Sequence, residues 1–317
     1  MPGREFHRKP PPLAARIAAG LWMECIFGPF MWIMRKLGRE EKLLASFSDL
    51  REKEFAKNNP LRDYVPGKQD VFVMTYPRSG TNWMLQIVYQ LIHHGKGEFD
   101  HIHSVVAWPD ARLHNPLMAR YAIPLEQATP EPRRLIKTHL NWELLPYSAE
   151  ARYIAVIRDP KEVFVSAYYF TSTAKSQLET MYRLFLADKF PLGGSWPAST
   201  AGYWAQRHRA NVLVISYASL KRDLQGTVRR VAAFLDIQVS DEVIREVCEK
   251  SSFDSMKRLE HKFGTGRMIP WRAPEKMIRQ GGSGELLTPE RQREIDAHCI
   301  AELKRLAPDL PYDELCQ

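Results

Sequence analysis

The chain has 317 residues, of which 44% are hydrophobic and 26% are charged, so it is neither a fibrous nor a disordered protein and can form one large domain. Its formal net charge of +8 favours acidic ligands such as nucleotides, anionic lipid or nucleic acid, although ordinary surface lysines give the same balance. The four cysteines are far apart and contain no CxxC pair, which argues against a structural zinc site and for a reducing compartment such as the cytoplasm.

The N-terminal part of the chain, residues 13–34, is strongly apolar. Arg16 and Glu24 interrupt the run, and Gly28 followed by Pro29 should break or kink a helix. A membrane span needs about 20 apolar residues, which this run barely supplies. Three interpretations stay open: a helix packed on its own domain or on a dimer partner, a helix at a membrane surface, and a true span.

From about residue 70, short β-rich apolar runs alternate with helical patterns, which predicts an α/β fold with a central parallel sheet flanked by helices. We therefore treat residues 1–44 as an apolar and basic segment, and 45–317 as one α/β domain. Ligands of such sheets bind beyond the carboxyl ends of the strands. The predicted strands are Val71–Thr75, Arg134–Lys137, Tyr153–Ile157 and Val212–Ser216. The predicted helices are Asn82–His94, Glu162–Phe170, Leu178–Lys189, Leu220–Leu235 and Asp241–Lys250.

Residues 95–133 and 171–205 interrupt this alternation with long stretches rich in proline, histidine, glycine and aromatic residues. Long ordered loops near strand ends usually form the walls of a substrate site. We expect their aromatic residues and those just before the second loop to line the pocket of an apolar small molecule: Trp108, Tyr121, Tyr168, Phe170, Tyr182, Phe185 and Trp196.

The strand at residues 71–75 continues into the basic loop Tyr76–Thr81, and a helix follows. The first N–H groups of a helix and its partial positive charge favour a phosphate, and Arg78 adds a full cation beside them. No lysine follows Gly80 and the Walker spacing is absent, which weakens a kinase interpretation.

A second group of candidate residues follows the predicted strand 134–137. Lys137 and His139 are two positions apart, so they should point into one cleft. Histidine can accept a proton near neutral pH, and lysine can stabilise developing negative charge.

Two further segments could bind an anion. Arg158 precedes a helix start at Asp159-Pro160, and Ser166 lies about two turns further on. Arg279 precedes the glycine-rich segment 280–284, whose N–H groups can approach an anion closely.

In combination and order, these motifs resemble the cytosolic-type sulfotransferases. Residues 75–83, TYPRSGTNW, look like that family's TYPKSGTxW phosphosulfate loop, which is P-loop-like. Lys137-Thr138-His139 matches its KTH segment, Arg158 and Ser166 match its 3′-phosphate arginine and serine, and residues 279–284 resemble its RKGxxG segment. The resemblance covers roughly residues 45–312 and includes Ile215-Ser216-Tyr217 and Ser251-Ser252-Phe253.

The resemblance implies a metal-independent sulfotransferase that uses 3′-phosphoadenosine 5′-phosphosulfate (PAPS) as donor and releases 3′-phosphoadenosine 5′-phosphate (PAP). It implies that His139 is the general base, that Lys137 steadies the sulfuryl and bridging oxygens, and that Arg78 neutralises the leaving group. The remaining cofactor-binding residues that it implies hold the 5′-phosphate (Ser79, Gly80, Thr81, Asn82), the adenine (Trp83, Phe253, Tyr217, Ser251) and the 3′-phosphate (Arg158, Ser166, Arg279, Gln280, Gly281).

The chain departs from the family pattern at several positions. Arg78 and Gln280 stand where the family carries lysine, and Glu285-Leu286 stands where it has Asp-Trp. Its dimer motif near the C-terminus is not matched around Thr288, which leaves a homodimer in doubt.

We expect a small apolar acceptor with a hydroxyl or an amine, no nucleic acid partner, and a cytoplasmic enzyme with a possible N-terminal contact to a membrane surface. The alternative function is a non-catalytic nucleotide-binding protein of the same fold at a membrane surface.

Overall fold

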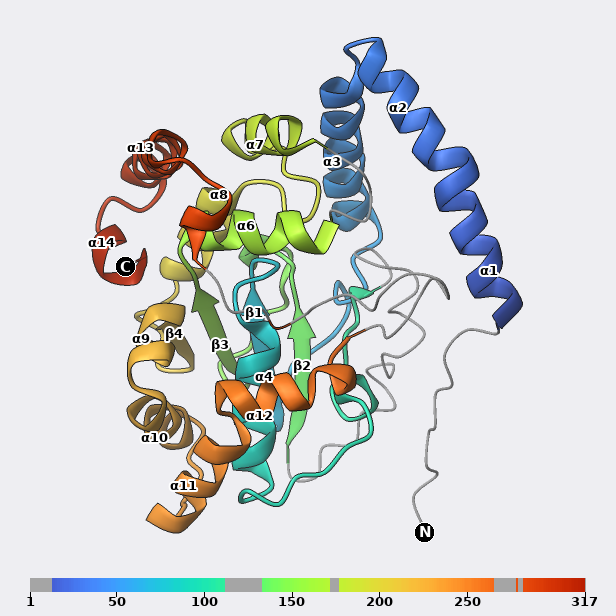
Figure 1. Cartoon of the computed structure of the whole chain (residues 1–317). Helices are drawn as coiled ribbons and strands as arrows, with labels where there is room; N and C mark the ends of the chain where they lie inside the picture. The colour runs from blue at the N-terminus through green and yellow to red at the C-terminus, as the bar shows by residue number, and fades with distance from the viewer. Residues whose placement is uncertain (1–12, 112–132, 172–176, 265–277, 279–281, 317) are drawn as a thin grey trace.

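A four-stranded, fully parallel sheet forms the centre of the molecule (Figure 1). The computed structural model describes residues 13–111, 133–171, 177–264, 278 and 282–316. Its strands are β1 (Asp70–Thr75), β2 (Arg134–Thr138), β3 (Arg152–Ile157) and β4 (Val212–Ser216), in the order β2-β1-β3-β4. All four predicted strands are confirmed to within one residue at each end, as is the predicted fold class.

Burial of the strands on both faces explains why they read as continuous apolar runs. Along β1, Val71 and Val73 belong to one buried cluster, whereas Phe72 and Met74 belong to another on the opposite face. This alternation follows from the two-residue period of a strand. Because helices cover both faces of this parallel sheet, its strands have no solvent-exposed side, and their sequences do not alternate between apolar and polar residues.

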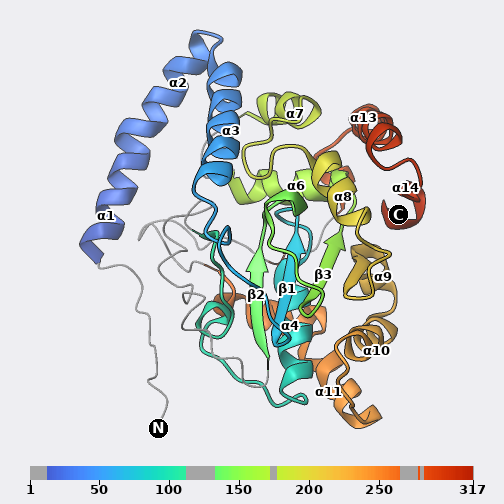
Figure 2. The ribbon, with the colours of Figure 1, turned by 180° about the vertical axis from the view of Figure 1, so that it is seen from behind.

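Helices cover both faces of the sheet, as Figures 1 and 2 show from opposite sides. The first core cluster combines strand residues with side chains of α4, α10, α11 and α12, and the second gathers side chains of α6, α7, α8 and α13. The helices with printed bounds in this region are α4 (Thr81–Ile92), α6 (Pro160–Thr171), α7 (Leu178–Leu186), α8 (Trp196–Trp204), α9 (Tyr217–Arg222), α10 (Leu224–Phe234), α11 (Asp241–Lys250), α12 (Phe253–Arg258), α13 (Pro289–Leu306) and α14 (Tyr312–Cys316).

Two helix predictions were wrong in detail. The predicted helix 220–235 is two helices, because Asp223 ends α9 and its side chain accepts a hydrogen bond from the Gly226 N–H at the start of α10. Residues 171–205 are not irregular throughout, since they contain α8 as well as α7. The sequence of α8 is apolar almost all round and its residues are mostly buried, so it lacks the polar stripe that marks a surface helix.

Before the sheet, the chain forms an N-terminal arm and a return helix. The arm consists of α1 (Leu13–Leu21), the π-helical turn η1 (Trp22–Phe27) and α2 (Gly28–Lys36). Gly28 and Pro29 begin α2 directly after the π-helical turn, so the expected break or kink does not end the helical path, and the α-helical pattern changes just before it. The helix α3 (Glu40–Lys57) then runs back beside α2 toward the sheet (Figure 1).

Candidate functional site

The carboxyl ends of the four strands place most of the predicted site residues at one edge of the sheet. In the register of the sheet, Met74 pairs with Thr138, Thr75 with Val156 and Ile157 with Ser216. The residues that follow these positions are therefore level with one another. The loop after β1, His139 after β2, Arg158 after β3 and Tyr217 after β4 face the same region, as the sequence predicted.

The loop between β1 and α4 turns sharply through two residues with positive φ. Arg78 has a φ of 73° and Gly80 a φ of 95°, and Gly80 is the N-cap of α4. No side chain caps this helix start, so the first amides of α4 stay available to an anion. The ring of Tyr217 lies against the loop, only 2.7 Å from where a Cβ on Gly80 would be.

Arg78 links the loop to the two residues predicted to hold the second phosphate. Its Nε donates to Ser166 Oγ over 3.1 Å, and its backbone carbonyl accepts from Arg158 Nη1 over 2.9 Å. Its guanidinium also lies 4.6 Å from the ring centroid of Phe170. Two arginines thus meet at the start of α4 and α6. They bring two positive charges and the planar N–H donors of two guanidinium groups to this corner of the site.

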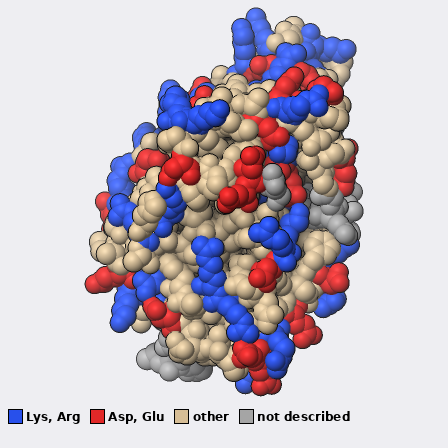
Figure 3. Space-filling view, turned by 90° about the vertical axis from the view of Figure 1, so that its left-hand side faces the viewer, with Lys and Arg blue, Asp and Glu red and all other residues tan. Residues whose placement is uncertain are grey.

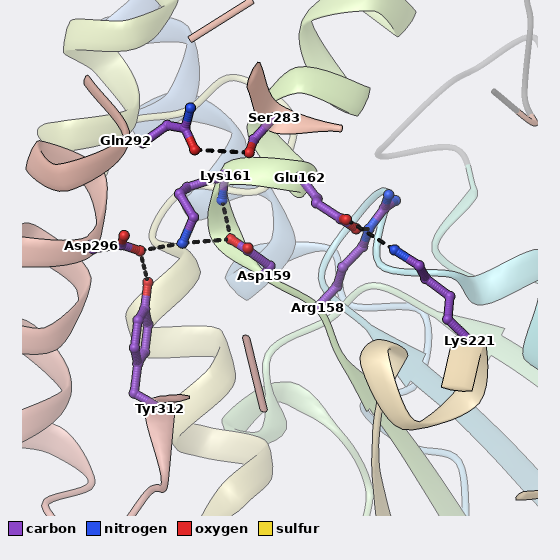
Figure 4. Close-up of polar contacts among 9 residues, drawn as sticks. All are labelled: Arg158, Asp159, Lys161, Glu162, Lys221, Ser283, Gln292, Asp296 and Tyr312. Carbon is purple, nitrogen blue, oxygen red and sulfur yellow. Dashed lines mark hydrogen bonds and ion pairs between the residues drawn. The ribbon is translucent and has the colours of Figure 1, made fainter. Parts of the chain in front are cut away.

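Ion pairs fix the start of α6 around this corner (Figure 4). Arg158 Nε lies 2.9 Å from Glu162 Oε2, and Lys221 Nζ lies 3.2 Å from the other oxygen of the same carboxylate. On the other side, Lys161 pairs with Asp159 and with Asp296 of α13. Because Glu162 already pairs with Arg158, an anion bound here would share this guanidinium with a carboxylate of the protein.

Three residues predicted to bind a purine lie together beside α4. The indole N–H of Trp83 donates to the Ser251 carbonyl over 2.6 Å, and the Trp83 ring meets that of Tyr217 edge-on at 5.5 Å. Phe253 begins α12 and is 38% exposed, so its ring is open to solvent. The resemblance implies that these side chains lie together, and the structure brings Trp83, Tyr217 and Ser251 into contact.

Several buried polar atoms of this region have no hydrogen-bond partner within the described part of the chain. They are Ser79 Oγ, Asn82 Oδ1 and Ser251 Oγ. Buried polar groups are normally paired, so orphaned ones in a site are suited to a ligand that completes them. All three belong to the predicted donor-binding residues.

The glycine-rich segment is only partly placed, because Arg279, Gln280 and Gly281 lie outside the described residues. The short helix η8 (Ser283–Glu285) that follows packs against α6. Ser283 Oγ donates to Gln292 Oε1 of α13 over 3.0 Å (Figure 4). The packing of η8 on α6 brings the end of the segment to the helix that carries Ser166.

His139 is held in one tautomer by the end of β1. Its Nδ1 lies 2.9 Å from the carbonyl oxygen of Thr75 and 3.3 Å from the Thr75 hydroxyl. A carbonyl can only accept, so Nδ1 carries the proton and donates. In the neutral imidazole Nε2 is therefore the acceptor, which is the arrangement that a general base requires.

Lys137 is buried beside His139, with only 5% of its surface exposed. Its Nζ lies 3.5 Å from the ring centroid of Trp108, and that ring also meets the His139 ring edge-on at 5.6 Å. Lys137 and His139 thus flank one aromatic ring on the same side of the sheet, as predicted. Burial lowers the pKa of Lys137, Asp110 opposes this shift and Arg78 adds to it, and together they leave the pKa at about 7.

Asp110 is a residue of this site that sequence analysis missed. It is fully buried, and its Oδ2 accepts the backbone N–H of His139 over 2.9 Å. Its loop joins the sheet edge, because Ala107 N–H donates to the Leu135 carbonyl and Ala107 O accepts from Lys137 N–H. A single acidic residue in a loop belongs to no recognisable sequence motif. Its place in the site becomes visible only when the structure puts this loop beside β2.

The predicted acceptor-lining aromatics divide into two groups. Trp108 and Phe170 contact the site through Lys137 and Arg78, as expected. Tyr182, Phe185 and Trp196 are wrong as pocket residues, because they are core side chains of the cluster around α6 and α7. The partly buried Tyr168 packs on the same cluster. Tyr121 lies outside the described residues.

The net positive charge does not form a single basic face on the side of the molecule that carries α9 to α11 and α13. Figure 3 shows Lys and Arg spread over that side with Asp and Glu between them. On that side, no separate basic face adds to the positive charge that Arg78, Arg158 and the start of α4 bring to the site.

Comparison with known proteins gives a consistent result. The sulfotransferase domain family matches residues 68–307. Sulfotransferase 2A1 of Macaca fascicularis is 30% identical over 233 residues, which are 70% of this chain and 79% of the relative. The 3-beta-hydroxysteroid sulfotransferase of Cavia porcellus is 30% identical over 248 residues, which are 76% of this chain and 77% of the relative.

Solved structures of similar fold share less sequence. Retinol dehydratase in complex with androsterone and inactive cofactor PAP has a TM-score of 0.70 at 20% identity, with 82% of this chain and 88% of that chain covered. A mouse sulfotransferase complexed with PAP has a TM-score of 0.59 at 22% identity, with 82% of this chain and 93% of that chain covered. At 20% and 22% identity, the similarity to these two structures shows a shared fold.

The conformation of Gly80 gives a first prediction. Gly80→Ala should destabilise the fold by about 1–3 kcal/mol, because the backbone has positive φ and the new methyl group meets the Tyr217 ring. Urea unfolding measures this loss. Gly67→Ala is the matched control, since it has open space around it. An equal effect of both substitutions would contradict this account of the loop.

Proposed function

The chain belongs to the sulfotransferase family, and we propose that it transfers the sulfuryl group of PAPS to a hydroxyl group of a small apolar acceptor, with His139 as general base. PAP is the second product. The observation that carries the proposal is the Nδ1 contact of His139 with the Thr75 carbonyl, because it leaves Nε2 as the acceptor beside Lys137 and the phosphate loop. We assign residues 45–317 to the catalytic domain and place its activity in the cytoplasm.

The donor fits the corner formed by the loop and the two arginines. Arg78, the amides of α4 and the hydroxyl of Ser79 would hold the 5′-phosphosulfate. Arg158 and Ser166 would hold the 3′-phosphate, together with Arg279, Gln280 and Gly281 of the glycine-rich segment. Trp83, Phe253, Tyr217 and Ser251 would hold the adenine.

The proposed transfer needs positioning and charge neutralisation more than covalent chemistry. His139 Nε2 takes the proton of the acceptor hydroxyl as its oxygen attacks the sulfur. The bond between sulfur and the bridging oxygen breaks on the opposite side, and the electron pair stays on the departing phosphate. Lys137 and Arg78 neutralise the charge that develops there, and the start of α4 contributes through its amides.

Arginine at position 78 has a further consequence in this proposal. Its guanidinium is planar and permanently charged, and here it is fixed by Ser166 and stacked on Phe170. It therefore supplies a constant positive charge to the leaving phosphate. Lys137 supplies a charge that depends on its protonation, because its pKa lies near neutrality.

The acceptor class rests on two observations. One relative is named 3-beta-hydroxysteroid sulfotransferase, and a solved neighbour is described as a complex with androsterone. Trp108 contacts both Lys137 and the His139 ring, so it would offer an aromatic wall to such a ring system. An amine acceptor is the competing possibility, which a screen of both classes with radiolabelled donor would resolve.

Donor identity is tested without knowing the acceptor. PAP and PAPS at about 100 times their Kd should each stabilise the protein by about 2.7 kcal/mol, measured by thermal unfolding. Arg158→Met should weaken PAP binding more than it weakens binding of adenosine 5′-phosphosulfate, which lacks the 3′-phosphate. Stabilisation by ATP without any by PAP or PAPS would overturn the donor assignment.

The role of His139 gives the next prediction. His139→Ala should keep PAP binding but lower the transfer rate by about 10² or more, because the acceptor hydroxyl loses its proton acceptor. His208→Ala is the control, since His208 is an exposed histidine outside the site. Unchanged transfer in the His139 variant would remove this residue from the mechanism. PAP binding without transfer by the wild type would favour the non-catalytic alternative.

Asp110 gives a pH-dependent prediction. Its negative charge raises the pKa of Lys137, so Asp110→Asn should lower that pKa. Lysine is charged below its pKa, so the loss of kcat/KM with rising pH should begin at a lower pH in the variant. Asp63→Asn, at an exposed position, is the control. An unmoved alkaline limb would show that Asp110 does not act through Lys137.

A further inference from the structure

The N-terminal arm α1–η1–α2 is a continuous helical path that leaves the body of the protein. Figures 1 and 2 show it beside α3 at one side of the molecule, pointing away from the sheet. Its 24 residues, Leu13–Lys36, are long and apolar enough to cross a membrane by length and composition, and only 17% of the apolar window is buried. Length and composition alone do not distinguish a span from a surface helix.

The second half of the arm is docked on the domain. Met31 is 1% exposed and belongs, with Leu44 of α3, to the core cluster around α6 and α7, and Phe27 packs on the same cluster. Arg35 pairs with the buried carboxylate of Glu40 at 2.8 Å. Thr180 of α7 donates to that carboxylate over 3.0 Å. These contacts dock α2 on α3 and on the core cluster around α6 and α7.

The side of the arm that faces away from these contacts is apolar. Trp22, Ile26, Phe30, Ile33 and Leu37 are 51%, 60%, 42%, 48% and 61% exposed. Their spacing of three or four residues places them along one side of a helix, and we call them the outer stripe. Water-exposed apolar side chains in such a continuous row indicate a surface that is covered by a partner.

The charges near the outer stripe favour an anionic lipid surface as that partner. Lys36 and Arg39 are exposed at its C-terminal end, next to the partly buried Arg35. Lys36 Nζ lies 5.7 Å from the ring centroid of Trp32, which is 56% exposed. Tryptophan and basic residues with long side chains are the groups that prefer the headgroup region of a bilayer.

We propose that the outer stripe lies in the interface of an anionic membrane, parallel to its plane, while α2 stays docked on α3. A span is disfavoured by length. If residues from Phe27 onward stay on the domain, residues 13–26 are what is left of the apolar run, and they extend about 21 Å as a helix. The hydrocarbon core is about 30 Å thick. The arm therefore fixes the protein to one leaflet.

Vesicle co-sedimentation tests this proposal with the full chain. The wild type should bind vesicles that contain phosphatidylglycerol and bind pure phosphatidylcholine vesicles more weakly. Ile26→Glu combined with Phe30→Glu should reduce binding about tenfold or more, because two carboxylates replace apolar side chains that would be buried. Val65→Glu is the matched control, because Val65 is an 85% exposed apolar residue outside the arm. Retained thermal stabilisation by PAP would show that the variants are folded.

A second variant tests the electrostatic contribution to membrane binding separately from the apolar one. Lys36→Gln with Arg39→Gln should weaken binding to anionic vesicles and flatten its salt dependence, with little effect on neutral vesicles. Equal vesicle binding by the outer-stripe variant and the wild type would overturn the proposal. So would resistance of the membrane-bound protein to alkaline carbonate, which indicates a span. A dimer that the outer-stripe variant abolishes, without vesicle binding by the wild type, would instead identify a second copy of the chain as the partner. None of these readouts depends on sulfuryl transfer.

Discussion

The pairing of β1 with β2 is the constraint on which the rest of the site depends. Because Met74 is opposite Thr138, the residue that follows β2 reaches the last carbonyl of β1, and Thr75 O accepts the Nδ1 proton of His139. The same carbonyl could not serve in this way if the register slipped by one residue, since every side chain would change face. Thr75 also contacts Thr81 at the start of α4 through its hydroxyl at 2.6 Å, so one residue connects the proposed base with the proposed phosphate seat.

Burial gives Lys137 and Arg78 different physical roles. Lys137 lies in the interior between the sheet and Trp108, and loss of hydration brings its pKa near neutrality. Asp110 opposes this shift from the same loop that supplies the tryptophan. A doubly charged phosphosulfate would act in the same direction as Asp110, only more strongly, because it brings opposite charge close to the amine. Donor binding and lysine protonation are then thermodynamically coupled, whereas the charge of Arg78 is constant.

Most of the fold was predictable because strands buried on both faces give unambiguous apolar runs, as at residues 71–75 and 153–157. Most site residues followed from their position just after those runs. What could not be predicted required tertiary contacts. Asp110 lies in the site because its loop is hydrogen-bonded to β2. Tyr182 does not line the pocket, because its side chain on α7 packs in the core. The apolar periodicity runs without interruption through residues 220–235, but Asp223 divides this stretch into two helices. It does so by accepting a hydrogen bond from the Gly226 N–H, and a hydrophobic pattern gives no sign of such a capping bond.

The N-terminal arm illustrates the same limit of composition. Length and hydropathy do not distinguish a core helix from a span here, and only the contacts of Met31 and Arg35 assign the two sides of α2 different surroundings. The proposed membrane position also fits the proposed chemistry. An apolar acceptor with one hydroxyl partitions into a bilayer with its hydroxyl near the headgroups, so its concentration is highest where the outer stripe would hold the enzyme. PAPS, which is highly charged, would reach the same enzyme from the aqueous side. An enzyme held at the membrane interface could therefore bind both substrates, one from the bilayer and the other from the aqueous phase.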